Sequence, residues 1–141
     1  MPLDNLFGIA GSALNAQSAR MNATASNLAN AATVAGSEKD AFRAKRVSFK
    51  TIIDQQAGKA ELSNLGGVQV SGISDDPKGI GRMSSPGNPL ADKDGYIYLS
   101  NVNEMTEMVE MMAASRSYQN NVEVVNTARQ LMLRTLDIIK S

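Results

Sequence analysis

The last third of the chain carries apolar side chains at alternating spacings of three and four residues. Between residues 102 and 139 this stripe consists of Met108, Met111, Ser115, Tyr118, Val122, Val125, Arg129, Met132, Leu136 and Ile139. Such alternation is typical of a coiled-coil seam, and no proline or glycine follows Gly95. The pattern predicts one helix of about 55 Å, which is too long for the core of a small domain. It requires a partner along its whole length.

A second, weaker heptad pattern occupies residues 3–32 at the other end of the chain. Large apolar side chains recur every seven residues, at Phe7, Leu14, Met21 and Leu28. The positions three residues later are small or polar, namely Ala10, Gln17, Thr24 and Ala31. Small seam residues allow two helices to approach closely. The economical arrangement is an antiparallel pair of the two terminal helices, with both termini at one end.

Three polar residues on these helices predict specific contacts. Asn27 and Asn30 flank the seam residue Leu28 and lie three residues apart on one helix face. We expect their amides to bind a neighbouring subunit or the start of the middle segment. Arg129 interrupts the apolar stripe of the C-terminal helix. Its guanidinium must therefore extend to solvent or pair with an acid.

The residues between the two helices, 33–101, change from helical to alternating periodicity. The alternation predicts three short strands, near residues 42–49, 68–73 and 96–99. Glycine-rich stretches predict loops, one of them around Gly58. Asp75 and Asp76 precede a proline. The pair could suggest a metal or acid–base site, but a turn is favoured, because neighbouring residues of an extended chain point to opposite sides.

These patterns predict a mainly α fold: an antiparallel coiled-coil pair of N- and C-terminal helices with a small β-rich middle extension. We assign residues 1–32 and 102–141 to the helical domain and residues 33–101 to the extension. The residues expected to pack subunits against one another are Leu14, Met21, Asn27, Leu28, Asn30, Met108, Met111, Tyr118, Val122, Val125, Arg129, Met132 and Leu136.

Composition narrows the chemistry that the chain can perform. It has 141 residues, 14 basic and 14 acidic side chains, and neither cysteine nor histidine. Serine–histidine and cysteine–histidine sites are therefore impossible, as are thiolate metal sites. A cluster of methionines around Met108 could bind a soft metal such as Cu(I), but core packing is the favoured use. We expect no enzymatic activity, no metal and no cofactor.

Charge and hydropathy also limit the partners. A basic cluster around Arg46 could form a nucleic-acid patch, but the net charge is zero and aromatic residues make up only 4 % of the chain. No stretch approaches the roughly 20 apolar residues of a membrane span. The N-terminus lacks the features of a cleaved signal peptide. We therefore expect no nucleic acid and no membrane insertion, and export, if it occurs, by another route.

Several stretches resemble a known family. Residues 26–33, SNLANAAT, are similar to the N-terminal signature of flagellar rod, hook and hook-associated proteins. Within this flagellar axial family, three further stretches resemble the proximal rod proteins. They are FRAKRVSF at 42–49, PGNPLAD at 86–92, and the segment from EMV at 107–109 to ASRSYQNN at 114–121. The resemblance covers nearly the whole chain.

The resemblance implies a structural subunit of the bacterial flagellar basal-body proximal rod, part of the drive shaft that transmits torque from motor to hook. The terminal helices would build the inner tube of this periplasm-spanning rod, with the middle segment outside. Export would use the flagellar type III system without cleavage of a signal peptide. Expected partners are copies of the chain itself, other rod proteins and the export-gate adaptor protein at the rod base. The heptads alone also permit a secreted or soluble coiled-coil adapter, which needs only one seam.

Overall fold

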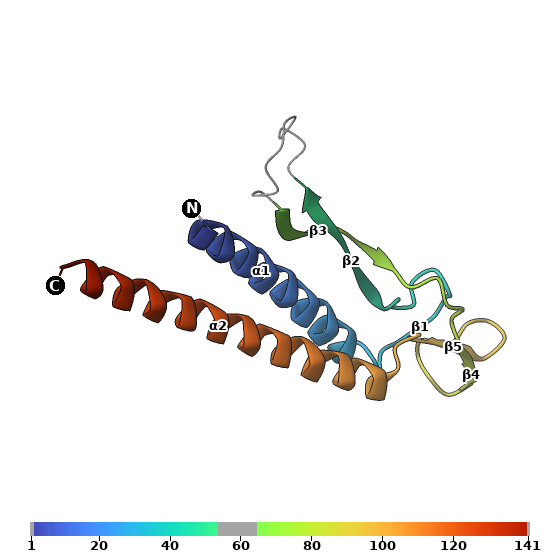
Figure 1. The fold of residues 1–141 in the computed structure, drawn as a ribbon. Helices are drawn as coiled ribbons and strands as arrows, with labels where there is room; N and C mark the ends of the chain where they lie inside the picture. Colours follow the sequence, from blue (N-terminus) through green and yellow to red (C-terminus); the bar gives the residue numbers. More distant parts are fainter. Residues whose placement is uncertain (1, 54–64, 141) are drawn as a thin grey trace.

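The computed structural model describes residues 2–53 and 65–140, which form two long helices and two small antiparallel sheets (Figure 1). Helix α1 spans Pro2–Ala29 and helix α2 spans Glu104–Lys140. The strands are β1 (Val34–Ala35), β2 (Lys45–Ile53), β3 (Leu65–Asp75), β4 (Arg82–Ser84) and β5 (Tyr96–Leu99). The loop predicted around Gly58 lies outside the described residues.

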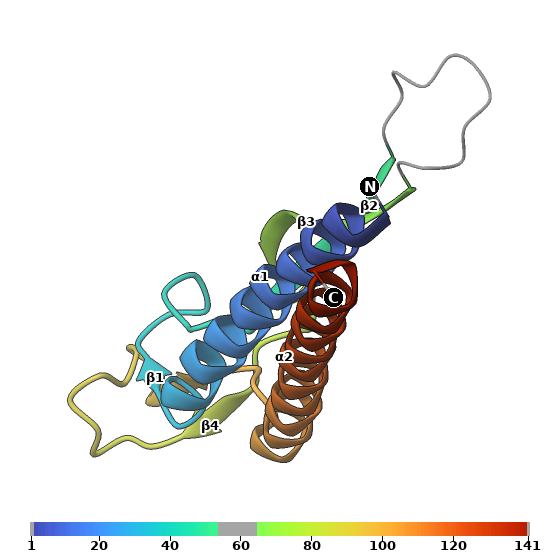
Figure 2. The same ribbon diagram turned by 60° about the vertical axis from the view of Figure 1, so that its left-hand side comes forward.

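The two helices lie side by side and run in opposite directions, with both chain termini at the same end (Figures 1 and 2). At the other end, β1, β5 and β4 form a three-stranded sheet in that order. Strand β1 follows α1, and β5 precedes α2. Their antiparallel pairing sets Val34 opposite Leu99 and so brings the end of α1 close to the start of α2. The predicted helical termini and β-rich middle are confirmed, while coiled-coil geometry remains a prediction.

Local sequence explains where α2 begins. The Asn103 side-chain oxygen accepts a hydrogen bond from the Thr106 backbone N–H at 3.0 Å, which is an N-cap. Glu104 and Glu107 follow in the first turn, where the helix dipole favours negative charge. In the part of the chain that the structure describes, neither helix is long and apolar enough to cross a membrane.

The second sheet is a long hairpin of β2 and β3 that lies against α1, so that α1 lies between the hairpin and α2 (Figure 1). The Ser12 hydroxyl accepts a hydrogen bond from the Val68 N–H at 3.1 Å and donates one to the Ile9 carbonyl at 2.7 Å. Gly67 is buried beside Ser12, where a β-carbon would lie only 3.3 Å from the Ser12 oxygen. The absence of a side chain therefore lets β3 approach the helix closely.

Gly66 provides a test of this close approach. Its φ of +125° is a conformation that residues with side chains rarely adopt, and an added β-carbon would lie 3.0 Å from Ile9 Cδ1. We expect Gly66→Ala to destabilise hairpin docking by about 1–3 kcal/mol, measured by hydrogen exchange of the β3 amides. Gly72→Ala is the matched control, because its β-carbon would meet nothing within 4 Å. Equal effects of the two substitutions would contradict this interpretation.

Alanine dominates the buried core. The buried apolar residues of the described chain are Ala10, Ala16, Ala23, Ala41, Ala44, Ile97, Ala114 and Ala128. Small side chains let the helices and the hairpin pack closely, but each buries little apolar surface. Burial of one methyl or methylene group stabilises a fold by only about 0.8 kcal/mol. The described core is therefore a weak one for a chain of this length.

The apolar stripe predicted on α2 lies only partly on its buried side. Its half-buried members include Met111, Tyr118, Val125 and Met132, whereas its exposed members are Met108, Val122, Arg129 and Leu136. The more buried side runs instead through Glu107, Ala114, Asn121 and Ala128 at the alternate positions. Periodicity analysis gives weight to large side chains, whereas close contact between helices selects small ones. At every second position, the predicted stripe residue therefore comes one residue later in the sequence than the residue on the more buried side.

Candidate functional site

Four parts of the chain meet where α1 ends, β2 begins, β3 ends and α2 begins. Asn27 of α1 is fully buried at this junction. The Lys45 N–H donates to Asn27 Oδ1 at 2.7 Å, and Asn27 Nδ2 donates to the Lys45 carbonyl at 3.0 Å. The amide thus satisfies both backbone groups of Lys45, as a neighbouring strand would. Asn27 thereby fixes the start of β2 on α1.

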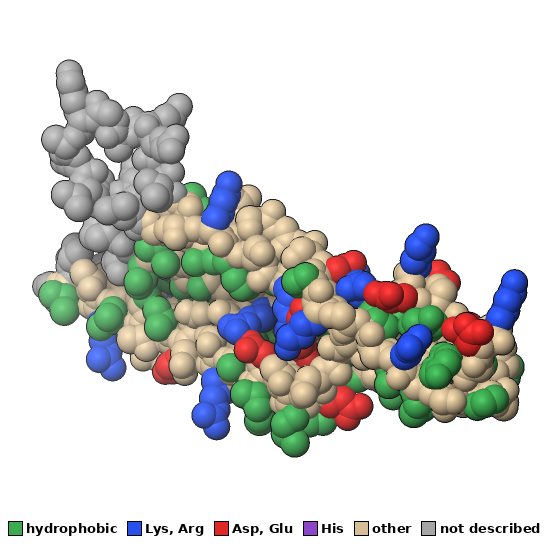
Figure 3. Space-filling view, turned by 90° about the vertical axis from the view of Figure 1, so that its right-hand side faces the viewer, with side chains coloured by type: hydrophobic (Ala, Val, Ile, Leu, Met, Phe, Trp, Pro, Cys, Tyr) green, Lys and Arg blue, Asp and Glu red, His purple; other side chains and the backbone are tan. Residues whose placement is uncertain are grey.

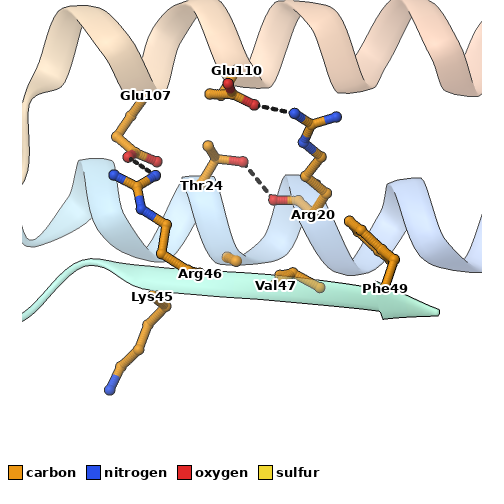
Figure 4. Close-up of a pocket in the computed structure, with 9 residues that line it drawn as sticks. Arg20, Thr24, Lys45, Arg46, Val47, Phe49, Glu107 and Glu110 are labelled. Carbon is orange, nitrogen blue, oxygen red and sulfur yellow. Dashed lines mark hydrogen bonds and ion pairs between the residues drawn. The ribbon is translucent and has the colours of Figure 1, made fainter. Parts of the chain in front are cut away.

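Glu107 of α2 places a buried carboxylate beside this amide, with only 1 % of the residue exposed. Its Oε2 accepts a hydrogen bond from Asn27 Nδ2 at 2.9 Å. Its Oε1 accepts one from Arg46 Nη1 at 2.8 Å, which Figure 4 shows. A buried carboxylate is strongly unfavourable unless it is paired and hydrogen-bonded. Since its donors come from α1 and β2, the burial of Glu107 requires three elements to be in place.

Arg46 bridges two acids, because its Nε also donates to Asp76 Oδ2 at 3.0 Å. Partial burial acts to lower the pKa of Arg46, but the bond to Asp76 and the charge of Glu107 outweigh it, and this pKa is raised. The Lys78 backbone N–H donates to Asp76 Oδ1 at 3.0 Å. That bond, together with Arg46, holds the pKa of Asp76 below its ordinary value despite burial. The chain bends at Lys78 where a turn was predicted, and Asp76 is also part of the junction.

Asn101, which precedes α2, holds the residue next to Lys45. Its Oδ1 accepts a hydrogen bond from the Ala44 N–H at 2.7 Å, and its Nδ2 donates to the Lys78 carbonyl at 3.0 Å. Ala44 is fully buried. Two asparagine amides, one from α1 and one from the residues just before α2, therefore bind the consecutive residues Ala44 and Lys45, where β2 begins.

A groove of about 370 Å³ opens beside the junction, between α1, α2 and β2 (Figure 4). It is lined by Arg20, Ala23, Thr24, Lys45, Arg46, Val47, Phe49, Glu107 and Glu110. Arg20 of α1 forms an ion pair with Glu110 of α2 across one side of it. Within residues 2–53 and 65–140, no group of three potential ligands could hold a metal ion. Arg20 pairs with Glu110 and Arg46 with Glu107 within the groove, and Lys45 pairs with Asp75 outside it. A groove whose charges are all paired suits a contact surface better than catalysis.

The other residues expected at subunit contacts are dispersed over the two helices. Leu14, Met21 and Leu28 are half-buried on α1. Asn27 binds the middle segment, whereas the Asn30 amide donates to the Ser26 carbonyl of its own helix at 2.8 Å. Asn27 therefore makes the expected contact with the middle segment, whereas a contact of Asn30 with a neighbouring subunit remains a prediction.

The exposed surface of α2 carries large apolar side chains in several directions. They are Met105, Met108, Val109, Met112, Val122, Val124, Leu131, Leu133, Leu136 and Ile138. Hydrophobic side chains lie open on the face of the molecule in Figure 3 as well. A helix that is apolar around most of its circumference is normally buried on all sides. Here α1 covers one side of α2 only, so the remaining sides are candidate contact surfaces.

Sequence reasoning missed Glu107 and Arg46 as junction residues. Arg46 was placed in a basic cluster, and Glu107 was given no role in the fold. Pairing across 61 residues of sequence leaves no local pattern. The one sequence feature that could have indicated burial of Glu107 is its position next to Met108 of the apolar stripe.

Comparisons with known proteins agree on one family. Residues 7–35 match the family model described as "Flagella basal body rod protein", and residues 93–138 match "Flagellar basal body rod FlgEFG protein C-terminal". The flagellar basal-body rod protein FlgC of Yersinia enterocolitica is 50 % identical over 138 residues, and that of Salmonella typhimurium is 48 % identical. The FlgC of Buchnera aphidicola from Acyrthosiphon pisum is 46 % identical over 142 residues. Each alignment covers 98 % of both chains.

Proposed function

The chain belongs to the FlgC family of flagellar basal-body rod proteins and is a structural subunit of that rod, and from this premise we propose that it occupies the proximal rod. There it forms part of the drive shaft that transmits torque from motor to hook. The observation that carries the proposal is the apolar surface of α2, of which α1 covers one side only. A rigid shaft needs each subunit to bind several neighbours, and this helix offers contact surfaces in several directions.

The predicted subunit-packing residues divide by exposure into two groups. Exposed Met108, Val122, Arg129 and Leu136 would contact neighbouring subunits directly. Half-buried Met111, Tyr118, Val125 and Met132 would support the pairing of α1 and α2. The neighbours would be copies of this chain, other rod proteins and the export-gate adaptor protein at the rod base. In this arrangement the helices form the inner tube and the β2–β3 hairpin lies outside.

We also propose export through the flagellar type III system without removal of an N-terminal segment. Helix α1 supports this, because Ala10, Ser12 and Ala16 take part in the fold and would be lost with a cleaved leader.

The basic cluster of the middle segment gives no support to a nucleic-acid function. Lys45 pairs with Asp75 at 2.5 Å, and Arg46 bridges two acids, so these charges are used within the chain.

The sharpest test uses Met112, which is 58 % exposed on α2. We expect Met112→Glu to abolish rod formation and motility in a strain that lacks the native subunit, because a neighbour would bury the new carboxylate without a partner. Met112→Leu is the matched control and should retain motility, since it keeps the side chain apolar and of similar size. The measurements are swimming assays and electron microscopy of isolated basal bodies. Normal swimming with Met112→Glu would count against this face as a subunit contact.

A further inference from the structure

The Arg46–Glu107 ion pair joins the β2–β3 hairpin to α2, whereas the hairpin's other described attachments are to α1 or to the residues that flank the hairpin. Ser12 of α1 binds the Val68 N–H, and Asn27 of α1 binds Lys45. Asn27 also donates to Glu107, so one side chain contacts both the hairpin and α2. The three elements therefore share a single hydrogen-bonded cluster whose central group is a buried carboxylate.

We propose that the Arg46–Glu107 pair makes docking of the hairpin and pairing of the two helices one cooperative event. When α2 is separated from α1, Arg46 keeps Asp76 but loses Glu107, and the hairpin loses this ion pair to α2 while its contacts to α1 remain. When the hairpin leaves a closed helix pair, Glu107 loses its guanidinium partner and keeps only the hydrogen bond from Asn27 of α1. Each event therefore favours the other, and coupling of this kind is reciprocal.

The coupling is a property of the isolated chain and does not depend on the proposed position in the rod. In the rod, the same coupling would link assembly of the helices to docking of the hairpin. Neighbouring subunits that hold α1 and α2 together would also hold the hairpin in its docked position, although they contact only the helices. The outer surface would then acquire its final form on assembly.

The test uses the full chain with Arg20→Cys and Glu110→Cys, because these two residues face each other across the helices and the chain has no other cysteine. A short bis-maleimide would link them covalently. Hydrogen exchange of β2 and β3 amides would be compared before and after linking, with circular dichroism to verify helix content. We expect linking to slow hairpin exchange by at least about tenfold, within the usual range of coupling between sites.

Glu107→Gln in the same linked chain should reduce this slowing to less than about twofold, since the neutral side chain has one acceptor oxygen and cannot accept from both Arg46 and Asn27. Arg46→Gln should do the same while leaving α2 unaltered, which covers the case that Glu107→Gln fails to fold. Glu104→Gln is the matched control, because it removes an exposed charge from the same helix end and should keep the full effect. The proposal is overturned if linking leaves hairpin exchange unchanged, or if both Glu107→Gln and Arg46→Gln respond as the parent chain does. Motility of the Met112 variants reports on the proposed function separately.

Discussion

Replacing Ala114 with aspartate is expected to abolish helix pairing and, with it, rod assembly. Ala114 is fully buried near the middle of the α2 segment that packs on α1. A larger side chain there would have no access to solvent, and an unpaired buried carboxylate costs several kcal/mol. Since the rest of the core consists mainly of alanine, little stability remains to offset that loss.

Ala113→Asp is the matched control, because Ala113 is exposed and precedes Ala114 in the same helix. Both substitutions add the same charge and have the same effect on helix propensity. Helix content would be followed by circular dichroism during titration with trimethylamine N-oxide, which favours states that bury surface. We expect the midpoint to rise strongly for Ala114→Asp and only slightly for Ala113→Asp. Similar midpoints for the two variants would show that this side of α2 does not pack on α1.

The second large effect concerns the isolated chain, whose helices are expected to be largely disordered until neighbouring subunits cover α2. Ordering one backbone residue costs about 1–2 kcal/mol. The buried apolar positions of α1 are alanines, each of which returns less than about 1 kcal/mol through burial. The larger side chains of α2, such as Met105 and Ile138, are 72 % and 75 % exposed. Their burial becomes available only in an assembly.

Backbone NMR of dilute monomer measures this directly. We expect poorly dispersed resonances from residues 6–31, and slow hydrogen exchange of the same amides in assembled rods. Because the hairpin is coupled to the helices through Glu107, its amides should also exchange rapidly in the monomer. Sharp, dispersed helical resonances from residues 6–31 at micromolar concentration would contradict the prediction.

Local periodicity was sufficient to predict the order and type of the main elements. Helices α1 and α2 extend over the two heptad patterns, and α1 ends at Ala29, shortly before the periodicity changes at Thr33. Alternation located β2, β3 and β5, although β1 and β4 have only two and three residues and no pattern of that length is distinctive. Family resemblance and composition led to the structural role in the rod. All of these predictions rest on the spacing of residues that lie close together in the sequence.

Other features were decided by the tertiary structure alone. Periodicity could not identify Ala114 and Ala128 as buried positions of α2, because alanine contributes little to an apolar pattern. The junction is a stronger case, since Asn27 and Glu107 are 80 residues apart and meet within one hydrogen bond. From the sequence alone, a charged side chain is predicted to be exposed, because burial of a charge is costly. Glu107 is buried here because two other elements bring Asn27 and Arg46 to its carboxylate, and only the folded chain supplies both donors at once.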